Sequence, residues 1–360
     1  MGQLGRFLAR ILLGINLIVA LFLLLSAYSS LIDPRIHPIW SCAGYFFPIF
    51  LLLNLLFLIF WLFAYRKFVF LPLLALVLCW DSIQTYIPIN WKEDTNTKQT
   101  IKILSYNTRA FGEKQAHTKA KPNDVLAYLQ RCDADIICIQ EYIWGDALKR
   151  KDIDFALKGY RYKHYLSLGK GLNGLGCYSR YPILSAKPIK YKSNRNGSVA
   201  YYIKVEKDTL LVVNNHLESN KILESDVETY QDMIDAPSRT KLLSGSWKLL
   251  RKLGEANAIR ADQTDIILNE VKESLMKHVV VCGDFNDIPL SYTHQKFNDE
   301  LKDAFTEAGN GIGITYNQHR LYFRIDHILV SQDIKVYECE VDDTFNASDH
   351  YPIWCSISWE

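Results

Sequence analysis

Two long uncharged runs open the chain, and a weaker third run follows them. Residues 11–32 and 39–65 contain no charged side chain, and each run reaches the roughly 20 apolar residues that a helix needs to cross the hydrocarbon core. The third run, residues 68–89, is interrupted by Asp81. The pattern predicts a membrane anchor over residues 1–90 with about three transmembrane helices.

Basic residues give the direction of this anchor. Arg6 and Arg10 precede the first run, and Arg66 with Lys67 form the loop after the second. Because Lys and Arg concentrate in cytoplasmic loops, three spans predict an integral membrane protein whose soluble part is extracytoplasmic. If the third run lies along the interface, the same rule leaves the soluble part in the cytoplasm. The first run also resembles a secretory signal, but its length favours an uncleaved anchor.

The rest of the chain alternates short apolar runs with polar and helical segments. Residues 91–100 are polar and predict a linker, and residues 101–360 predict one folded domain. Strands are expected at residues 101–106, 135–140, 176–179, 199–205, 210–214, 279–282, 327–330 and 352–357, and helices at residues 123–131, capped by Asn123, and 256–273. Residues 219–254 are interpreted as an inserted helical or loop segment. Since the glycine-rich dinucleotide and P-loop motifs are absent from the sequence, this alternation favours a layered α/β sandwich over a Rossmann unit.

Composition and charge exclude several classes of protein. With 360 residues, 49% of them hydrophobic and 22% charged, the chain is neither disordered nor a small disulfide-stapled peptide. Beyond the anchor, basic and acidic residues nearly balance, which argues against nucleic-acid binding through a broad basic surface but leaves a local basic groove open. The cysteines show no C-x-x-C spacing, so a structural zinc site is not supported, and disulfide pairing stays open.

Acids, amides and imidazoles follow the apolar runs, where a strand delivers a side chain to the rim of a sheet. These residues are Asn107, Gln140, Glu141, Asn215, His216, Asp284, Asn286, Asp326, His327, Asp349 and His350. Taken singly, each has an ordinary explanation, because Asp and Asn form turns and helix caps, and a lone His or Glu at a strand end is usually solvated. Together they suit a hard divalent cation and a phosphate.

The ordered motifs SYN, QE, GLGCYSRYPI, NNHLE, GDFND, RIDHIL and SDHYPI give this set a more specific meaning. Between residues 103 and 358 the chain resembles the endonuclease/exonuclease/phosphatase superfamily, whose fold is that of pancreatic deoxyribonuclease. The resemblance implies a four-layered α/β sandwich, with two packed β-sheets flanked by helices, and one divalent-metal phosphoesterase site at the strand ends.

The resemblance also implies a metal site. Glu141 is then the main ligand of Mg²⁺, with Mn²⁺ as an alternative, and Asn107 lies beside it. Asp349 is a further ligand of the metal or of its water.

The remaining matched positions take catalytic roles under the same resemblance. Asp284 orients or deprotonates the attacking water, and Asn286 holds a phosphoryl oxygen. His350 contacts the scissile phosphate while Asp326 holds its ring, and His216 donates to the phosphate or to the leaving oxygen. The implied reaction is metal-assisted in-line attack of water on a phosphodiester or phosphomonoester.

The sequence leaves the substrate open. A membrane anchor raises the effective concentration of the domain near phospholipid headgroups, yet it would equally retain a nuclease that acts on DNA or RNA. A catalytically silent binding module is a third alternative, and no protein partner is inferable. Arg260 and Gln263 resemble another feature of the family, although a solvated helix face explains them as well.

Overall fold

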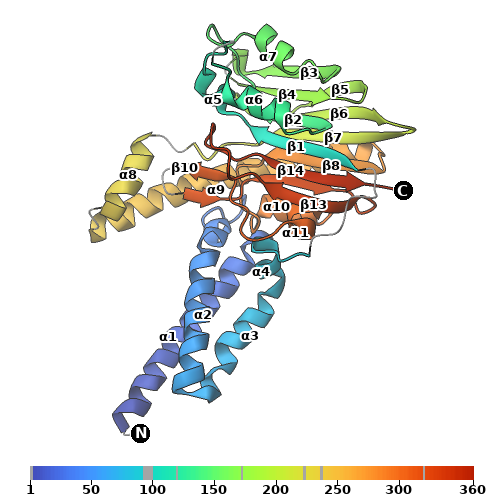
Figure 1. The fold of residues 1–360 in the computed structure, drawn as a ribbon. Helices are drawn as coiled ribbons and strands as arrows, with labels where there is room; N and C mark the ends of the chain where they lie inside the picture. The colour runs from blue at the N-terminus through green and yellow to red at the C-terminus, as the bar shows by residue number, and fades with distance from the viewer. Residues whose placement is uncertain are drawn as a thin grey trace.

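Two stacked β-sheets form the centre of the part of the chain that follows residue 100 (Figure 1). The computed structural model describes residues 3–91, 100–118, 121–171, 173–221, 224–235, 238–318 and 321–360. The first sheet has the order β13-β14-β1-β2-β4-β3, and the second has the order β5-β6-β7-β8-β12-β9. In each sheet one pair of central strands, β1 with β2 and β7 with β8, runs parallel.

The expected strands are present, with bounds that differ by a few residues. The first sheet contains β1 (Ile101–Asn107), β2 (Ile136–Gln140), β3 (Tyr162–Leu168), β4 (Asn173–Ser179), β13 (Lys335–Val341) and β14 (Ile353–Ser358). The second contains β5 (Ile183–Ile189), β6 (Gly197–Val205), β7 (Asp208–His216), β8 (His278–Asp284), β9 (Lys302–Asp303) and β12 (Asp326–Val330). A separate hairpin pairs β10 (Tyr316–Gln318) with β11 (Leu321–Phe323).

Helices cover the outer faces of both sheets. The helices that follow residue 100 are α5 (Arg109–Lys114), α6 (Asp124–Arg131), α7 (Arg150–Ala156), α8 (Glu224–Asp235), α9 (Arg239–Glu273), α10 (Tyr292–Asn298) and α11 (Ala304–Ala308). Among these, α8 covers no sheet and projects to the side of the sandwich (Figure 1). Asn123 caps α6 as expected, because its side chain accepts from the backbone N of Leu126 at 3.0 Å. The helix expected from residue 256 begins at Arg239, so part of the segment interpreted as an insertion belongs to α9. Residues 109–113 have positive φ, so α5 is a left-handed turn.

Three apolar clusters account for the layers. One lies between the sheets and contains Ile103, Val212 and Ile328. A second joins α6 and α7 to the first sheet, and a third joins α9 and α10 to the second sheet. The result is a four-layered α/β sandwich, which confirms the expected fold. All eight cysteines are free thiols, and most are buried in these layers.

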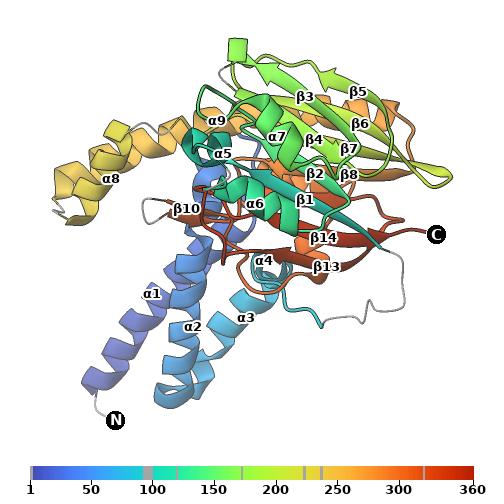
Figure 2. The same ribbon diagram turned by 45° about the horizontal axis from the view of Figure 1, so that its top comes forward.

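The N-terminal helices project away from the sandwich (Figures 1 and 2). Helix α1 (Gln3–Ala27) is long and apolar enough to cross a membrane, and so is the helix Trp40–Ala64, which consists of the 3₁₀ segment η2 (Trp40–Phe46) and α2 (Phe47–Ala64). The third apolar run is not one straight helix. Its two parts, α3 (Phe70–Leu78) and α4 (Trp80–Tyr86), meet at a bend of 60°.

The helical part is docked on the sandwich and contacts it at several points. Arg35 forms ion pairs with Asp262 and Asp265 of α9, at 3.3 and 2.6 Å. Asn257 of the same helix donates to Ser41 Oγ at 3.0 Å. Most of the expected linker, residues 92–99, lies outside the described residues. Contacts elsewhere nevertheless hold the helical part against α9, so the linker is not its sole connection to the sandwich.

Candidate active site

Strand register aligns three of the expected residues in one row across the second sheet. His216 on β7 pairs with Asp284 on β8, and Asp284 pairs in turn with Asp326 on β12. In the first sheet Asn107 ends β1 opposite Gln140 on β2, which puts Glu141 just beyond the same edge. The carboxyl ends of both parallel pairs therefore bring their polar side chains together.

Asp284 lies at the centre of this group. Its Oδ1 accepts from the backbone N of Asn286 at 2.8 Å, and its Oδ2 accepts from Asn107 Nδ2 at 2.9 Å. The preceding Gly283 has φ of 134°, and a Cβ there would lie 2.0 Å from the carbonyl oxygen of Asn215. Only glycine fits this close approach, so the Gly-Asp order of the GDFN motif has a direct structural reason.

His350 and Asp326 form a buried pair beside Asp284. His350 Nδ1 lies 2.7 Å from Asp326 Oδ2, and His350 Nε2 faces Asp284 Oδ2 at 3.7 Å. Burial lowers the pKa of His350, but the charges of Asp326 and Asp284 outweigh it and raise the pKa to about 10. Burial raises the pKa of Asp326, and the neighbouring imidazole opposes that shift. The ring is therefore held in one orientation, with Nδ1–H donating to Asp326.

His216 approaches Asp284 from the other side. Its Nε2 lies 3.6 Å from Asp284 Oδ2, and Asn173 Nδ2 lies 3.1 Å from its Nδ1. Because Asn173 Oδ1 accepts from the backbone N of Gly174, the group that Asn173 turns toward the imidazole is its NH₂ donor. His216 Nδ1 is then the acceptor, which leaves the ring proton on Nε2, directed toward the centre of the site.

The predicted metal ligands lie at the same edge. Asn107 Nδ2 contacts Glu141 Oε1 at 3.4 Å as well as Asp284, so the amide joins two carboxylates. Glu141 has φ of 52°, a left-handed conformation that is uncommon for a non-glycine residue and typical of functional sites. Asp349 is directed toward Arg109, with 3.7 Å between its Oδ2 and the guanidinium.

This donor set fits a hard divalent cation. Carboxylate and amide oxygens are the ligands that Mg²⁺ prefers, and Glu141, Asp284 and Asp349 concentrate negative charge around one cavity. Asn107 presents its amide hydrogens to the carboxylates here, and a rotated amide would present its oxygen to the same place.

One large cavity collects six of the eight predicted residues. Its volume is about 1710 Å³, and the predicted residues on its wall are Glu141, His216, Asp284, Asn286, Asp349 and His350. Asn107 and Asp326 are buried behind the wall and contact Asp284 and His350. The structure thus brings all eight together. Asn286 donates one amide hydrogen to the carbonyl oxygen of Leu217 at 3.1 Å, and its second hydrogen remains available.

Two amides lie below the site: Gln140, which the sequence analysis placed at a strand end without assigning it a role, and Asn214, which it did not single out. Gln140 Nε2 donates to Asn214 Oδ1 at 2.6 Å, and Asn214 Nδ2 donates to the carbonyl oxygens of Ile139 and Gly176. These bonds tie the two sheets together directly beneath the candidate site residues. In the sequence, each of these amides stands out as a polar residue in an otherwise apolar strand, but nothing there shows that the two side chains meet.

Arg260 and Gln263 are buried, so the interpretation as a solvated helix face is wrong. Arg260 has no exposed surface, pairs with Asp287 at 3.2 Å and donates to the carbonyl oxygen of Glu218 at 2.8 Å. Gln263 Oε1 accepts from the backbone N of Glu218 at 2.9 Å. Both side chains fasten the loops after β7 and β8 to α9, and so position His216 and Asp284.

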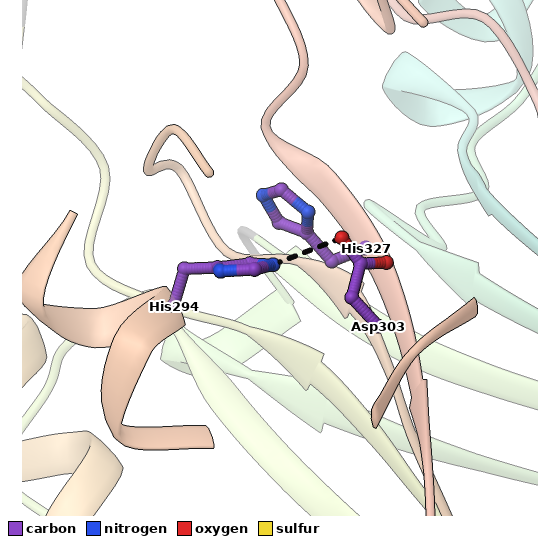
Figure 3. Close-up of side chains that lie close together, drawn as sticks. All are labelled: His294, Asp303 and His327. Carbon is purple, nitrogen blue, oxygen red and sulfur yellow. Dashed lines mark hydrogen bonds and ion pairs between the residues drawn. The ribbon is translucent and has the colours of Figure 1, made fainter. Parts of the chain in front are cut away.

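A second buried cluster lies outside this cavity (Figure 3). His294 Nε2 contacts Asp303 Oδ2 at 3.2 Å, and His327 Nε2 donates to the carbonyl oxygen of Asp287 at 2.9 Å. Asp303 also caps α11 by accepting from the backbone N of Phe305. These groups therefore serve the packing of α10 and α11 against β12.

The sandwich and the helical part match two different protein-family models. The model of the Endonuclease/Exonuclease/phosphatase family matches residues 104–350. A model described only as a domain of unknown function matches residues 9–86. No curated protein sequence matches the chain.

Solved structures share the fold at low sequence identity. An endonuclease/exonuclease/phosphatase from Bacteroides vulgatus covers 73% of this chain and 100% of its own, at 17% identity and a TM-score of 0.52. The human Nocturnin catalytic domain with bound sulfate covers 72% and 94%, at 15% identity and a TM-score of 0.51. D. rerio TDP2 complexed with single strand DNA product covers 72% and 100%, at 14% identity and a TM-score of 0.50.

Proposed function

Because the chain belongs to the endonuclease/exonuclease/phosphatase family, we propose that it is a membrane-anchored, divalent-metal-dependent phosphoesterase that hydrolyses a phosphodiester by in-line attack of water. The observation that carries this proposal is the row formed by His216, Asp284 and Asp326. His350 completes it, because Asp326 holds the ring with its Nε2 facing Asp284. Burial of two charged groups carries a desolvation cost, and buried charged pairs aimed into a cavity are typical of catalytic sites.

Glu141, Asn107 and Asp349 would hold Mg²⁺, or Mn²⁺ in its place. When bound, the cation supplies charge neutralisation for the phosphoryl oxygens and lowers the pKa of a bound water.

The side chains of this protein supply the proton transfers and the orientation of the phosphate. Asp284 accepts a proton from the attacking water, since its Oδ2 faces the cavity between two imidazoles. His350, protonated and held by Asp326, donates from Nε2 to a phosphoryl oxygen. His216 donates from Nε2 to the phosphate or the leaving oxygen, and Asn286 offers its remaining amide hydrogen to the phosphate. No covalent intermediate with the protein is needed.

Turnover of a small phosphodiester tests the proposal without a commitment to a natural substrate. The full chain in detergent is incubated with bis(p-nitrophenyl) phosphate and Mg²⁺, beside Asp284→Asn and the exposed control Asp343→Asn. We expect Asp284→Asn to lower kcat by about 10²- to 10⁴-fold and Asp343→Asn to leave it unchanged. A folded wild-type protein without turnover would favour a silent binding module, and equal rates in all three proteins would mean that the turnover does not depend on Asp284.

The membrane side of the domain is part of the same proposal. In this proposal residues 1–90 are the anchor and residues 101–360 the catalytic domain. The positive-inside rule places Arg66 and Lys67 on the cytoplasmic side. If the bent α3–α4 pair then crosses the membrane, the catalytic domain lies outside the cytoplasm. A reporter fused after Glu360 should then be active only on the outer side. Cytoplasmic activity would mean that α3 and α4 do not span.

A further inference from the structure

The cavity at the active site extends to the membrane anchor. Besides Glu141, Asp284 and His350, its wall includes Phe46 and Ile49, which belong to the long apolar helix Trp40–Ala64. Phe46 and Ile49 keep 42% and 54% of their surface exposed. A single hollow therefore joins the phosphoesterase residues to a helix that is apolar enough to lie in a bilayer.

Helix α9 supplies the opposite apolar wall. Leu249, Leu250 and Leu253 line the cavity and are only half-buried. This part of α9 contacts the anchor directly, because Cys42 Sγ donates to the carbonyl oxygen of Leu250 at 3.7 Å. The apolar end of the cavity thus runs between the anchor and α9.

The same stretch of α9 has the composition of a helix that rests on a membrane surface. Trp247 is 60% exposed, and beside it the exposed Lys248 and Arg251 form ion pairs with Asp226 and Glu255 at 2.8 and 3.0 Å. Basic residues with an aromatic anchor are typical of interfacial helices, where the cations meet lipid phosphates. Figures 1 and 2 show α8 and the first part of α9 projecting sideways from the sandwich, near the ends of the membrane helices that adjoin it.

The polar end of the cavity carries cations as well as the metal-binding carboxylates. Lys192 and Arg195 lie on exposed backbone before β6 and line the cavity near His216. They complement an anionic phosphoester, while the leucines and Ile49 complement hydrocarbon. One occupant with both properties is a phospholipid.

We infer that the natural substrate is a membrane phospholipid that enters the site from the bilayer between α2 and α9. This inference rests on the phosphoesterase activity proposed above. The acyl chains lie along Phe46, Ile49 and Leu253 while the phosphate reaches Asp284 and His350. Water adds OH to phosphorus, one P–O ester bond breaks, and the released alcohol oxygen takes the second proton of the water.

A matched pair of substitutions on one helix tests the route. Ile49→Trp places a bulky ring in the groove, whereas Ile59→Trp adds the same ring to α2 at a residue of nearly equal exposure, 53%, that does not line the cavity. The full chain is reconstituted in nanodiscs of phosphatidylcholine and phosphatidylglycerol with Mg²⁺. Loss of phosphodiester and gain of phosphomonoester are followed by ³¹P NMR, and bis(p-nitrophenyl) phosphate is the water-soluble substrate.

We expect Ile49→Trp to lower phospholipid hydrolysis at least tenfold, with the rate on the soluble substrate within twofold of wild type. Ile59→Trp should change neither rate. In EDTA, a phosphatidylcholine carrying a diazirine in its acyl chain should label residues 249–253 in the wild type and much less in Ile49→Trp.

Three results would overturn the inference. The first is hydrolysis of the soluble substrate, or nicking of supercoiled plasmid, by a protein that leaves the phospholipids intact. The second is an Ile49→Trp variant whose phospholipid rate equals that of wild type, or whose two rates fall together. The third is no labelling of residues 249–253. If the wild type hydrolyses neither phospholipid nor soluble substrate, the proposed function itself fails, and that outcome is distinct from the other three.

Discussion

The Asp326→Asn substitution tests whether the buried Asp326–His350 pair sets the charge of the imidazole. The substitution opens no cavity, because the amide has nearly the volume of the carboxylate, so only the charge is removed. In the wild type the two groups are 2.7 Å apart, both side chains are nearly fully buried, and the pKa of His350 is raised to about 10.

The size of the effect follows from the contact. Two unit charges about 4 Å apart interact by about 4 kcal/mol at an effective dielectric constant near 20. One pKa unit corresponds to about 1.36 kcal/mol, so loss of the Asp326 charge should lower the pKa of His350 by about 3 units, to about 7. At pH 9 a His350 with a pKa of about 10 is mostly protonated, whereas one with a pKa of about 7 is only about 1% protonated, so kcat at pH 9 should fall by about 10²-fold. KM should change little, because Asp326 does not line the cavity.

The assay has two parts. The pKa of His350 is measured in EDTA by NMR of ¹³C-labelled histidine, with His350→Gln to assign the signal, and kcat is measured with Mg²⁺. The matched control is Asp333→Asn, because Asp333 contacts His278 Nδ1 at 2.6 Å in a pair away from the cavity. An unchanged pKa of His350, or a kcat that falls as much in Asp333→Asn as in Asp326→Asn, would refute the reasoning.

Three further predictions concern stability. Arg260→Met leaves the buried Asp287 carboxylate unpaired and should lower the free energy of unfolding by about 3–5 kcal/mol, measured by denaturant titration. Gly254→Ala puts a Cβ 2.6 Å from the Pro38 carbonyl oxygen and should destabilise the docked anchor by about 1–3 kcal/mol, seen as a lower Tm; an unchanged Tm would mean that the anchor is not docked. Because the folded pKa of His350 is raised from 6.5 to about 10, its contribution to stability is complete below pH 6.5 and is lost as the pH rises through 10. The Tm of the metal-free protein should therefore fall over that range more steeply in wild type than in His350→Gln.

The strands that the sequence revealed are the interior ones. β1, β2 and β8 are buried along nearly their whole length and are read as apolar runs. The edge strands β3 and β13 are half-buried and carry polar residues on both faces, so their patterns resemble loops. The sequence analysis did not identify the four strands at the edges of the two six-stranded sheets, which also include β5 and β9, and it did not identify the hairpin strands β10 and β11.

The start of α9 was missed for a related reason. Its first half contains glycines and many basic residues and lacks a clear apolar stripe, because that half projects from the sandwich instead of packing on a sheet. Periodicity identifies a helix only where one face is buried. The half from residue 256 onward has such a face, with Ile267 and Leu268 in the core, and was predicted.

The candidate site was predictable as a set of residues but not as a geometry. Motif order placed Asp284 and His350 in one site, and register explains why they meet. The contacts of Asn173 and Asn214 join strands far apart in the sequence, and no local pattern encodes such pairs. The docking of the anchor on α9 was equally invisible, since it depends on close approaches such as that of Gly254 to Pro38.

The measurement that tests the central claim most directly is the initial rate of bis(p-nitrophenyl) phosphate hydrolysis against free Mg²⁺ concentration, for wild type, Glu141→Gln and Asp284→Asn. A site built on Glu141 and Asp284 predicts a saturable dependence that EDTA abolishes. It also predicts that Glu141→Gln needs a higher Mg²⁺ concentration for half-maximal rate and that Asp284→Asn stays slow at every concentration. A wild-type rate that is independent of Mg²⁺ and of EDTA, or identical curves for the three proteins, would contradict the account.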